Sequence, residues 1–165
     1  MKGLVSDTAD GRAQSQALSH AKLPVYYPRL IASGSAYCSE LTANCNDGEE
    51  PATAYLHSYP RAYTINGPGG KQYKAYRMTL VINYLLGEYY GVQGTTWNNP
   101  PLLSSPAGTR TINGRKLFLY EDGSKLTQVA WHNNGVAYWI SNNLTEKLTN
   151  NQMLQIAASL THYRR

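Results

Sequence analysis

Two residues in the sequence combine a reactive side chain with an aromatic setting. Glu88 lies between Gly87 and the pair Tyr89-Tyr90, and His57 lies among tyrosines in TAYLHSYPR. A carboxylate or an imidazole in such surroundings can serve as a general acid or base. The sequence therefore leaves open a hydrolase or transferase that uses Glu88 or His57, with a structural role for His57 as the simpler interpretation. No serine lies in the G-x-S-x-G pattern of a nucleophile elbow.

The segment 87–103, GEYYGVQGTTWNNPPLL, is the strongest candidate for a binding site. It contains three glycines and two prolines and has no clean period, which predicts an ordered loop. Loops of this length without regular structure are often functional. Tyrosine and tryptophan rings stack on sugars and peptides while amide groups bond to hydroxyls, and packing of the same rings onto a sheet is the alternative. The candidate ligand-binding residues are Glu88, Tyr89, Tyr90, Gln93 and Trp97.

The charge of the chain is modestly positive. It carries 15 Lys and Arg against 10 Asp and Glu, a formal net charge of +5, and the cations are dispersed. We do not expect nucleic acid as a partner, because such proteins concentrate their cations in a patch or stripe. A dispersed basic surface attracts anionic glycopolymer or anionic lipid equally well. We expect no cofactor and no metal, since zinc takes four ligands and His57 is the one histidine near the cysteines in sequence.

The two cysteines, Cys38 and Cys45, enclose a polar stretch of six residues. This spacing favours a disulfide bond and an extracytoplasmic location, with two unrelated free thiols as the alternative. No apolar run approaches the roughly 18 residues of a membrane helix, and the N-terminus lacks the apolar stretch of a signal peptide. If the protein is exported, we expect the signal to lie outside this chain.

Alternating apolar residues between turn signals predict an α+β domain built on an antiparallel sheet. We expect a hairpin with a long second strand, formed by Arg61–Asn66 and Lys71–Leu86. A three-stranded meander follows, with strands at Lys116–Glu121, Ser124–Trp131 and Val136–Ser141. The domain spans residues 23–165, and residues 1–22 form a linker or a short N-terminal helix.

A C-terminal helix is predicted to pack on one face of this sheet. Thr149 with Gln152 three residues later forms the pattern of a capping box. Apolar residues follow at i, i+3, i+4 and i+7, which gives one buried stripe. The stripe consists of Met153, Ile156, Ala157 and Leu160. Arg164 and Arg165 are expected near the negative end of the helix.

Tyrosine is over-represented, with 14 Tyr against a single Phe, and 11 of the 14 lie between residues 26 and 90. Tyrosine combines an apolar ring with a hydroxyl that requires water or a hydrogen-bond partner. The excess therefore indicates a region in which aromatic rings also hydrogen-bond, either in the core or at a ligand.

Four segments together resemble a known family. GEYYGVQGTTWNNPPLL, INGRKLFLY, VAWHNNGVAYWISNNLT and LTNNQMLQIAASL are similar to the C-terminal extracytoplasmic region of some actinobacterial cell-envelope proteins of the LytR-CpsA-Psr family. The resemblance covers roughly residues 12–162 and implies a location outside the membrane. The family's catalytic domain resembles a phosphotransferase that attaches undecaprenyl-pyrophosphate-linked glycopolymers to peptidoglycan. Its hallmark arginines and aspartates have no counterpart here, so the resemblance implies an accessory role without that activity.

The expected function is therefore that of a non-catalytic extracytoplasmic accessory domain of a cell-envelope assembly protein. Its expected partner is cell-wall glycan, an anionic glycopolymer or an envelope protein, contacted through segment 87–103. A cell-wall-modifying hydrolase or transferase using Glu88 or His57 is one alternative. A purely structural or dimerising module is the other.

Overall fold

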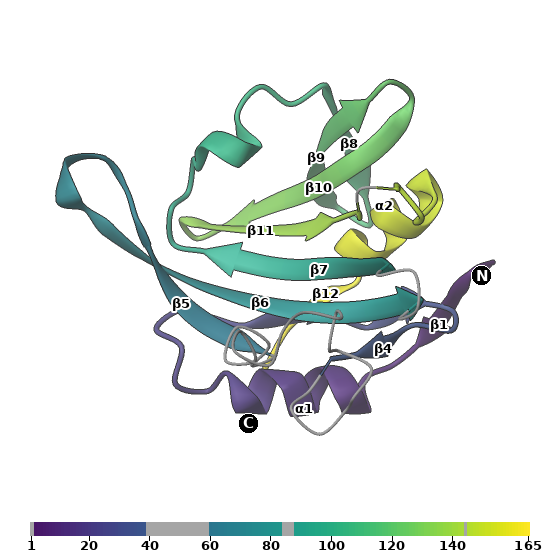
Figure 1. Ribbon diagram of the computed structural model, residues 1–165, viewed down its shortest axis with the longest axis horizontal. Coiled ribbons are helices and arrows are strands. Elements are labelled where there is room, and N and C mark those ends of the chain that lie inside the picture. The colour runs from purple at the N-terminus through teal and green to yellow at the C-terminus, as the bar shows by residue number, and fades with distance from the viewer. Residues whose placement is uncertain (1, 39–59, 84–87, 144) are drawn as a thin grey trace, which may run out of the picture.

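An antiparallel sheet of eight strands dominates the computed structural model, which describes residues 2–38, 60–83, 88–143 and 145–165 (Figure 1). The strand order is β4-β6-β7-β11-β10-β9-β8, and β5 pairs with β6 beside β4. The strands are β4 (Ala36–Tyr37), β5 (Arg61–Asn66), β6 (Gln72–Asn83), β7 (Glu88–Thr95), β8 (Gly108–Ile112), β9 (Arg115–Asp122), β10 (Lys125–Asn133) and β11 (Val136–Ser141). Short 3₁₀ turns occur at Pro68–Gly70 and Pro101–Leu103.

Two small strand pairs and two helices complete the described part of the chain. The pairs are β1 (Leu4–Ser6) with β3 (Leu30–Ala32), and β2 (Tyr26–Pro28) with β12 (Leu160–His162). The helices are α1 (Ala9–Ala17) and α2 (Asn150–Ala158). Neither helix is long and apolar enough to cross a membrane, and no other helix of that kind occurs in the described ranges.

The predicted combination of an antiparallel sheet with a C-terminal helix is present, but the sheet is larger than a hairpin plus a meander. The hairpin is β5–β6, and β9, β10 and β11 pair in sequence as the meander. The strands β4, β7 and β8 were not predicted from the sequence. Of these, β7 is the most important, because it joins the hairpin to the meander by pairing with β6 and β11.

The prediction that segment 87–103 is a loop is wrong for its first half, which is strand β7. Two of the glycines that indicated a loop, Gly91 and Gly94, are places where other side chains approach the backbone closely. A Cβ atom on Gly94 would lie 2.5 Å from Cε1 of Tyr76 and 2.9 Å from Cδ1 of Tyr138. Glycine inside a strand commonly marks such an approach.

One face of the sheet, here called the inner face, carries the main core. It presents large buried side chains from four adjacent strands, which pack against α2 and the N-terminal segment. They include Tyr76, Met78 and Leu80 of β6, Tyr90 and Val92 of β7, Tyr138 and Ile140 of β11, and Val129 of β10. The opposite face, here called the outer face, carries the alternate residues of the same strands.

Helix α2 begins with the predicted capping box. Thr149 Oγ1 accepts the Gln152 N–H at 3.1 Å, and Gln152 Oε1 accepts the Thr149 N–H at 2.9 Å. The helix ends earlier than expected, at Ala158, because Leu160 pairs with Pro28 as part of β12. Arg115 rather than Arg164 or Arg165 meets the helix end, donating from Nη1 to the carbonyls of Ala157 and Ala158.

The N-terminal residues form the short helix rather than a linker. Helix α1 buries Gly11, Gln14 and Ser15 and contacts β2 and β4. Gln14 Nε2 donates to the carbonyl of Cys38 at 2.9 Å. This buried hydrogen bond ties α1 to the residue that follows β4.

The buried tyrosines hydrogen-bond to the N-terminal segment. Tyr138 donates to the carbonyl of Pro24 at 2.8 Å, and the hydroxyl of Tyr90 accepts the Ala32 N–H at 3.0 Å. The segment around β2 and β3 is too short to satisfy all of its backbone groups by strand pairing, and phenylalanine could not supply these bonds. The tyrosine excess is therefore in part a structural device of the core.

Candidate ligand-binding surface

The five predicted ligand-binding residues do not form one cluster. Glu88 and Tyr90 lie on the inner face together with Val92, whereas Gln93 lies on the outer face. Tyr89 packs beside Cys38 and Val81. Trp97 lies beyond the end of β7 and is half-buried.

Tyr90 belongs to the core and not to a surface. It is 1% exposed, and its hydroxyl bonds to Ala32 and lies 2.8 Å from Ser35 Oγ. Burial raises the pKa of Tyr90 to about 12. We therefore remove it from the candidate ligand-binding residues and assign it to packing.

Glu88 is buried on the inner side of the sheet, away from Gln93. Its Oε2 accepts the hydroxyl of Thr145 at 3.3 Å, and its Oε1 is buried without a hydrogen bond. His57, the other residue of the enzyme alternative, lies outside the described residues. Among the described residues, the hydrogen-bond partner of the Glu88 carboxylate is a hydroxyl group and not a second titratable side chain.

The outer face carries a polar row across the adjacent strands β5, β6 and β7. Arg61 pairs with Arg77, and Arg77 pairs with Gln93. Gln93 Nε2 donates to Ser141 Oγ at 3.1 Å, which fixes the amide group. Two arginines directly opposite each other concentrate positive charge at this end of the sheet.

Gly91 allows the Arg77 side chain to lie flat on the sheet. A Cβ atom on Gly91 would be 2.8 Å from Cζ of Arg77 and 2.8 Å from Ser141 Oγ. Arg77 Nε also donates to Thr79 Oγ1 at 3.1 Å. The guanidinium is thus held in one orientation beside Gln93.

An aromatic pair stands next to this row, where β6 leaves the body of the sheet in the projecting β5–β6 hairpin (Figure 1). The rings of Tyr73 and Trp97 are stacked, with centroids 4.8 Å apart and planes 9° from parallel. Lys71 Nζ lies 5.5 Å from the centroid of the Tyr73 ring. A Cβ atom on Gly67 would be 2.6 Å from Tyr73 Cε2, so the hairpin turn lies directly against this ring.

Tyr63 connects the polar row to the aromatic pair. It lies on β5 between Arg61 and Ile65, and Ile65 pairs with Tyr73. The Arg61 guanidinium lies 5.2 Å from the centroid of the Tyr63 ring. Burial raises the pKa of Tyr63, and the charges of Arg77 and Arg61 oppose that shift.

We define the outer-face surface as the side chains that these contacts link. All of them are half-buried except Gln93, which is buried. Its residues are Arg61, Tyr63, Tyr73, Arg77, Gln93 and Trp97. It combines flat aromatic rings with fixed hydrogen-bond donors and two cations. Of the predicted residues, only Gln93 and Trp97 belong to it. The other four residues were not predicted from the sequence, because they lie on β5 and β6 and come near Gln93 and Trp97 only when these strands pair into the sheet.

The predicted disulfide involves one described residue. Cys38 is fully buried after β4, and Cys45 lies outside the described residues, so the bond stays a prediction. Within the described ranges, no three His, Cys, Asp or Glu side chains are grouped as metal ligands would be.

Comparisons with known proteins identify no relative of this chain. No family model matches the sequence, no curated protein matches it, and no solved structure matches its fold. The fold and the outer-face surface are therefore the basis for a functional proposal.

Proposed function

We propose that this chain is a non-catalytic extracytoplasmic domain that accompanies a cell-envelope assembly enzyme and binds cell-wall glycan through the outer-face surface. The observation that carries the proposal is the half-exposed Trp97 ring stacked on Tyr73, on the same side of the sheet as Arg77 and Gln93. The family resemblance of the sequence supports the cell-envelope location.

The chemistry of the outer-face surface suits a polyhydroxylated polymer. Aromatic rings supply apolar area at a low cost in conformational entropy, and the guanidinium groups of Arg61 and Arg77 supply donors beside the buried Gln93 side chain. The two arginines add attraction for phosphate or carboxylate groups on the polymer. The net charge of +5 raises the rate at which an anionic polymer is encountered.

Co-sedimentation with purified cell-wall sacculi tests the proposal. We expect the domain to be retained by sacculi that carry their anionic polymer, and the retention to weaken as salt is added. Removal of the anionic polymer with hydrofluoric acid separates the two ligand types, because peptidoglycan alone then remains. Absence of retention on both preparations contradicts the proposal. A stable dimer in light scattering, combined with no retention, indicates the dimerising module instead.

A further inference from the structure

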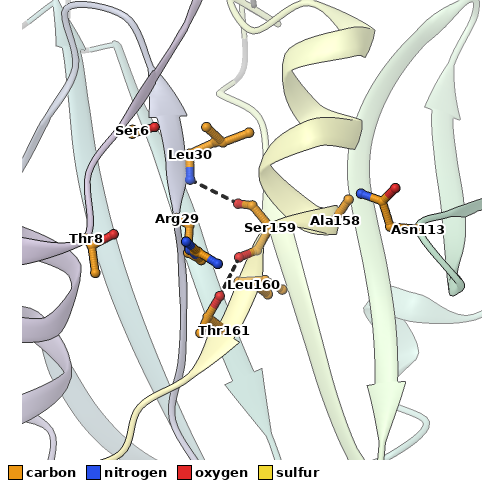
Figure 2. A pocket seen from close by; sticks show the side chains of 9 residues that line it. All are labelled: Ser6, Thr8, Arg29, Leu30, Asn113, Ala158, Ser159, Leu160 and Thr161. Carbon is orange, nitrogen blue, oxygen red and sulfur yellow. Dashed lines mark hydrogen bonds between the residues drawn. The ribbon is translucent and has the colours of Figure 1, made fainter.

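A second polar site lies on the side of the sheet that carries the helices. It is a pocket of about 360 Å³ between the end of α2, strand β12 and the β2–β3 connection (Figure 2). Small-molecule sites span about 300–1,000 Å³, so the pocket is large enough for one small ligand. Its polar side chains are Ser6, Thr8, Arg29, Asn113, Ser159 and Thr161, and no acidic residue is among the lining residues.

Two of the hydroxyls in the pocket donate their hydrogen bonds to backbone carbonyls of the protein. Ser159 Oγ donates to the carbonyl of Ile156 at 2.8 Å and accepts the Leu30 N–H at 3.1 Å. Thr161 Oγ1 donates to the carbonyl of Ser159 at 2.9 Å. Ser159 Oγ therefore has one remaining lone pair and Thr161 Oγ1 has two, and each can accept a hydrogen bond from a ligand.

The other polar side chains of the pocket supply donors. The guanidinium of Arg29 is turned toward Ser159 and Thr161, and the amide nitrogen of Asn113 faces Ala158 (Figure 2). Neither group has a hydrogen bond to another described side chain or carbonyl. Arginine carries its charge at all physiological pH values, so the pocket contains one fixed positive charge.

The local backbone positions Asn113 for this role. Asn113 and Gly114 form the turn between β8 and β9, with φ values of 50° and 78°. This is the mirror-image hairpin turn that asparagine followed by glycine favours. The turn brings Asn113 to Ala158 from a distant part of the sequence.

The end of α2 would repel an anion if its carbonyls were unpaired, because the C-terminus of a helix is its negative end. Arg115 removes this obstacle. Its Nη1 is 3.2 Å from the carbonyl oxygens of both Ala157 and Ala158, and its guanidinium lies 3.8 Å from the centre of the Trp131 ring. A negative group in the pocket therefore meets Arg29 without an exposed helix end beside it.

We propose that this pocket binds an anionic sugar unit, a hexose-sized polyol that carries one phosphate or carboxylate group. The negative group pairs with Arg29, and sugar hydroxyls donate to Ser159 and Thr161. An inorganic anion has few protons to donate and leaves these lone pairs unmatched. The inference is independent of the proposed function, because the outer-face surface shares none of its residues.

Chemical-shift mapping by NMR tests this site on the whole chain. The probes are glucose 6-phosphate, glucuronate, glucose and inorganic phosphate. We expect glucose 6-phosphate or glucuronate to shift the amide signals of Thr8, Asn113 and Thr161, with weaker binding of glucose and of inorganic phosphate. Whichever of the two charged sugars binds more tightly identifies the anionic group.

Arg29→Gln and Arg110→Gln form a matched pair of variants, because both arginines are exposed and each change removes one positive charge. Arg110 lies on β8 and does not line the pocket. We expect Arg29→Gln to weaken binding by about tenfold or more, as loss of a charge-assisted hydrogen bond predicts, and Arg110→Gln to have little effect. Equal losses in both variants, absence of shifts with either charged sugar, or equally tight binding of inorganic phosphate would overturn the proposal.

Discussion

The hydroxyl of Tyr76 bonds to both backbone groups of Tyr26, accepting its N–H at 3.0 Å and donating to its carbonyl at 2.7 Å. Tyr76 lies in the middle of β6, and Tyr26 begins the short strand β2. One side chain thus provides a hydrogen-bond donor and an acceptor to the backbone of Tyr26, which also pairs with His162 of β12. With Tyr90 and Tyr138, it attaches the N-terminal segment to the inner face of the sheet.

Replacement of this hydroxyl tests its contribution to stability. We expect Tyr76→Phe to lower the free energy of unfolding by about 1–3 kcal/mol, because a backbone donor and acceptor of Tyr26 lose their partner. Tyr73→Phe is the control, since the Tyr73 hydroxyl has no hydrogen bond to a described residue, and we expect a change within about 0.5 kcal/mol. Urea denaturation measures both values. Equal effects in the two variants would show that the Tyr76 hydroxyl is not structural.

The buried tyrosines also predict a loss of stability in alkali. Burial raises the pKa of Tyr90 from its ordinary 10.0 to about 12, and burial raises the pKa values of Tyr76 and Tyr138 as well. Above the ordinary pKa the unfolded state releases these protons while the folded state keeps them, so stability falls as pH rises. The contribution of Tyr90 is complete below pH 10 and is lost as the pH passes about 12.

Ultraviolet absorbance of tyrosinate, followed together with circular dichroism, checks this expectation. Part of the tyrosinate signal should appear only with the loss of secondary structure. Complete ionisation of all tyrosines near the ordinary pKa with the fold intact would refute it.

The close approach at Gly94 predicts a large effect of adding a methyl group. We expect Gly94→Ala to destabilise the fold by about 1–3 kcal/mol, because the new Cβ meets the rings of Tyr76 and Tyr138 in the packed core. Gly108→Ala on β8 is the matched control, since nothing lies within 4 Å of a Cβ there. We expect this control to be neutral or slightly stabilising in thermal unfolding. Equal tolerance of both changes would contradict the packing of β7.

The elements that sequence reasoning predicted are those whose patterns are local. Strands β9 and β10 of the meander are joined by the Gly123-Ser124 turn, and the capping box of Thr149 with Gln152 defines the start of α2. Leu160 continued the apolar period of the helix, yet it lies in β12. The spacing of apolar residues alone does not show whether Leu160 belongs to the last turn of the helix or to a buried strand.

Strand β7 and the outer-face surface depend on contacts that no local pattern contains. The glycines of β7 accept side chains from other strands: Arg77 lies over Gly91, and Tyr76 and Tyr138 lie over Gly94. The sequence indicated Gln93 and Trp97 by residue type. It did not indicate Tyr73, because the stacking of Tyr73 on Trp97 follows from the register of β6 against β7.

The most direct test of the proposed glycan-binding role is retention of Trp97→Ala on purified sacculi, measured together with its melting temperature. Leu102→Ala is the control, because Leu102 is an apolar residue of the neighbouring 3₁₀ turn that is 54% exposed. We predict that Trp97→Ala weakens retention by about tenfold or more, as the loss of a central aromatic contact does. Its melting temperature should fall by no more than about 4 °C, and Leu102→Ala should behave like the unmodified chain. Unchanged retention of Trp97→Ala would contradict the role of the outer-face surface in binding.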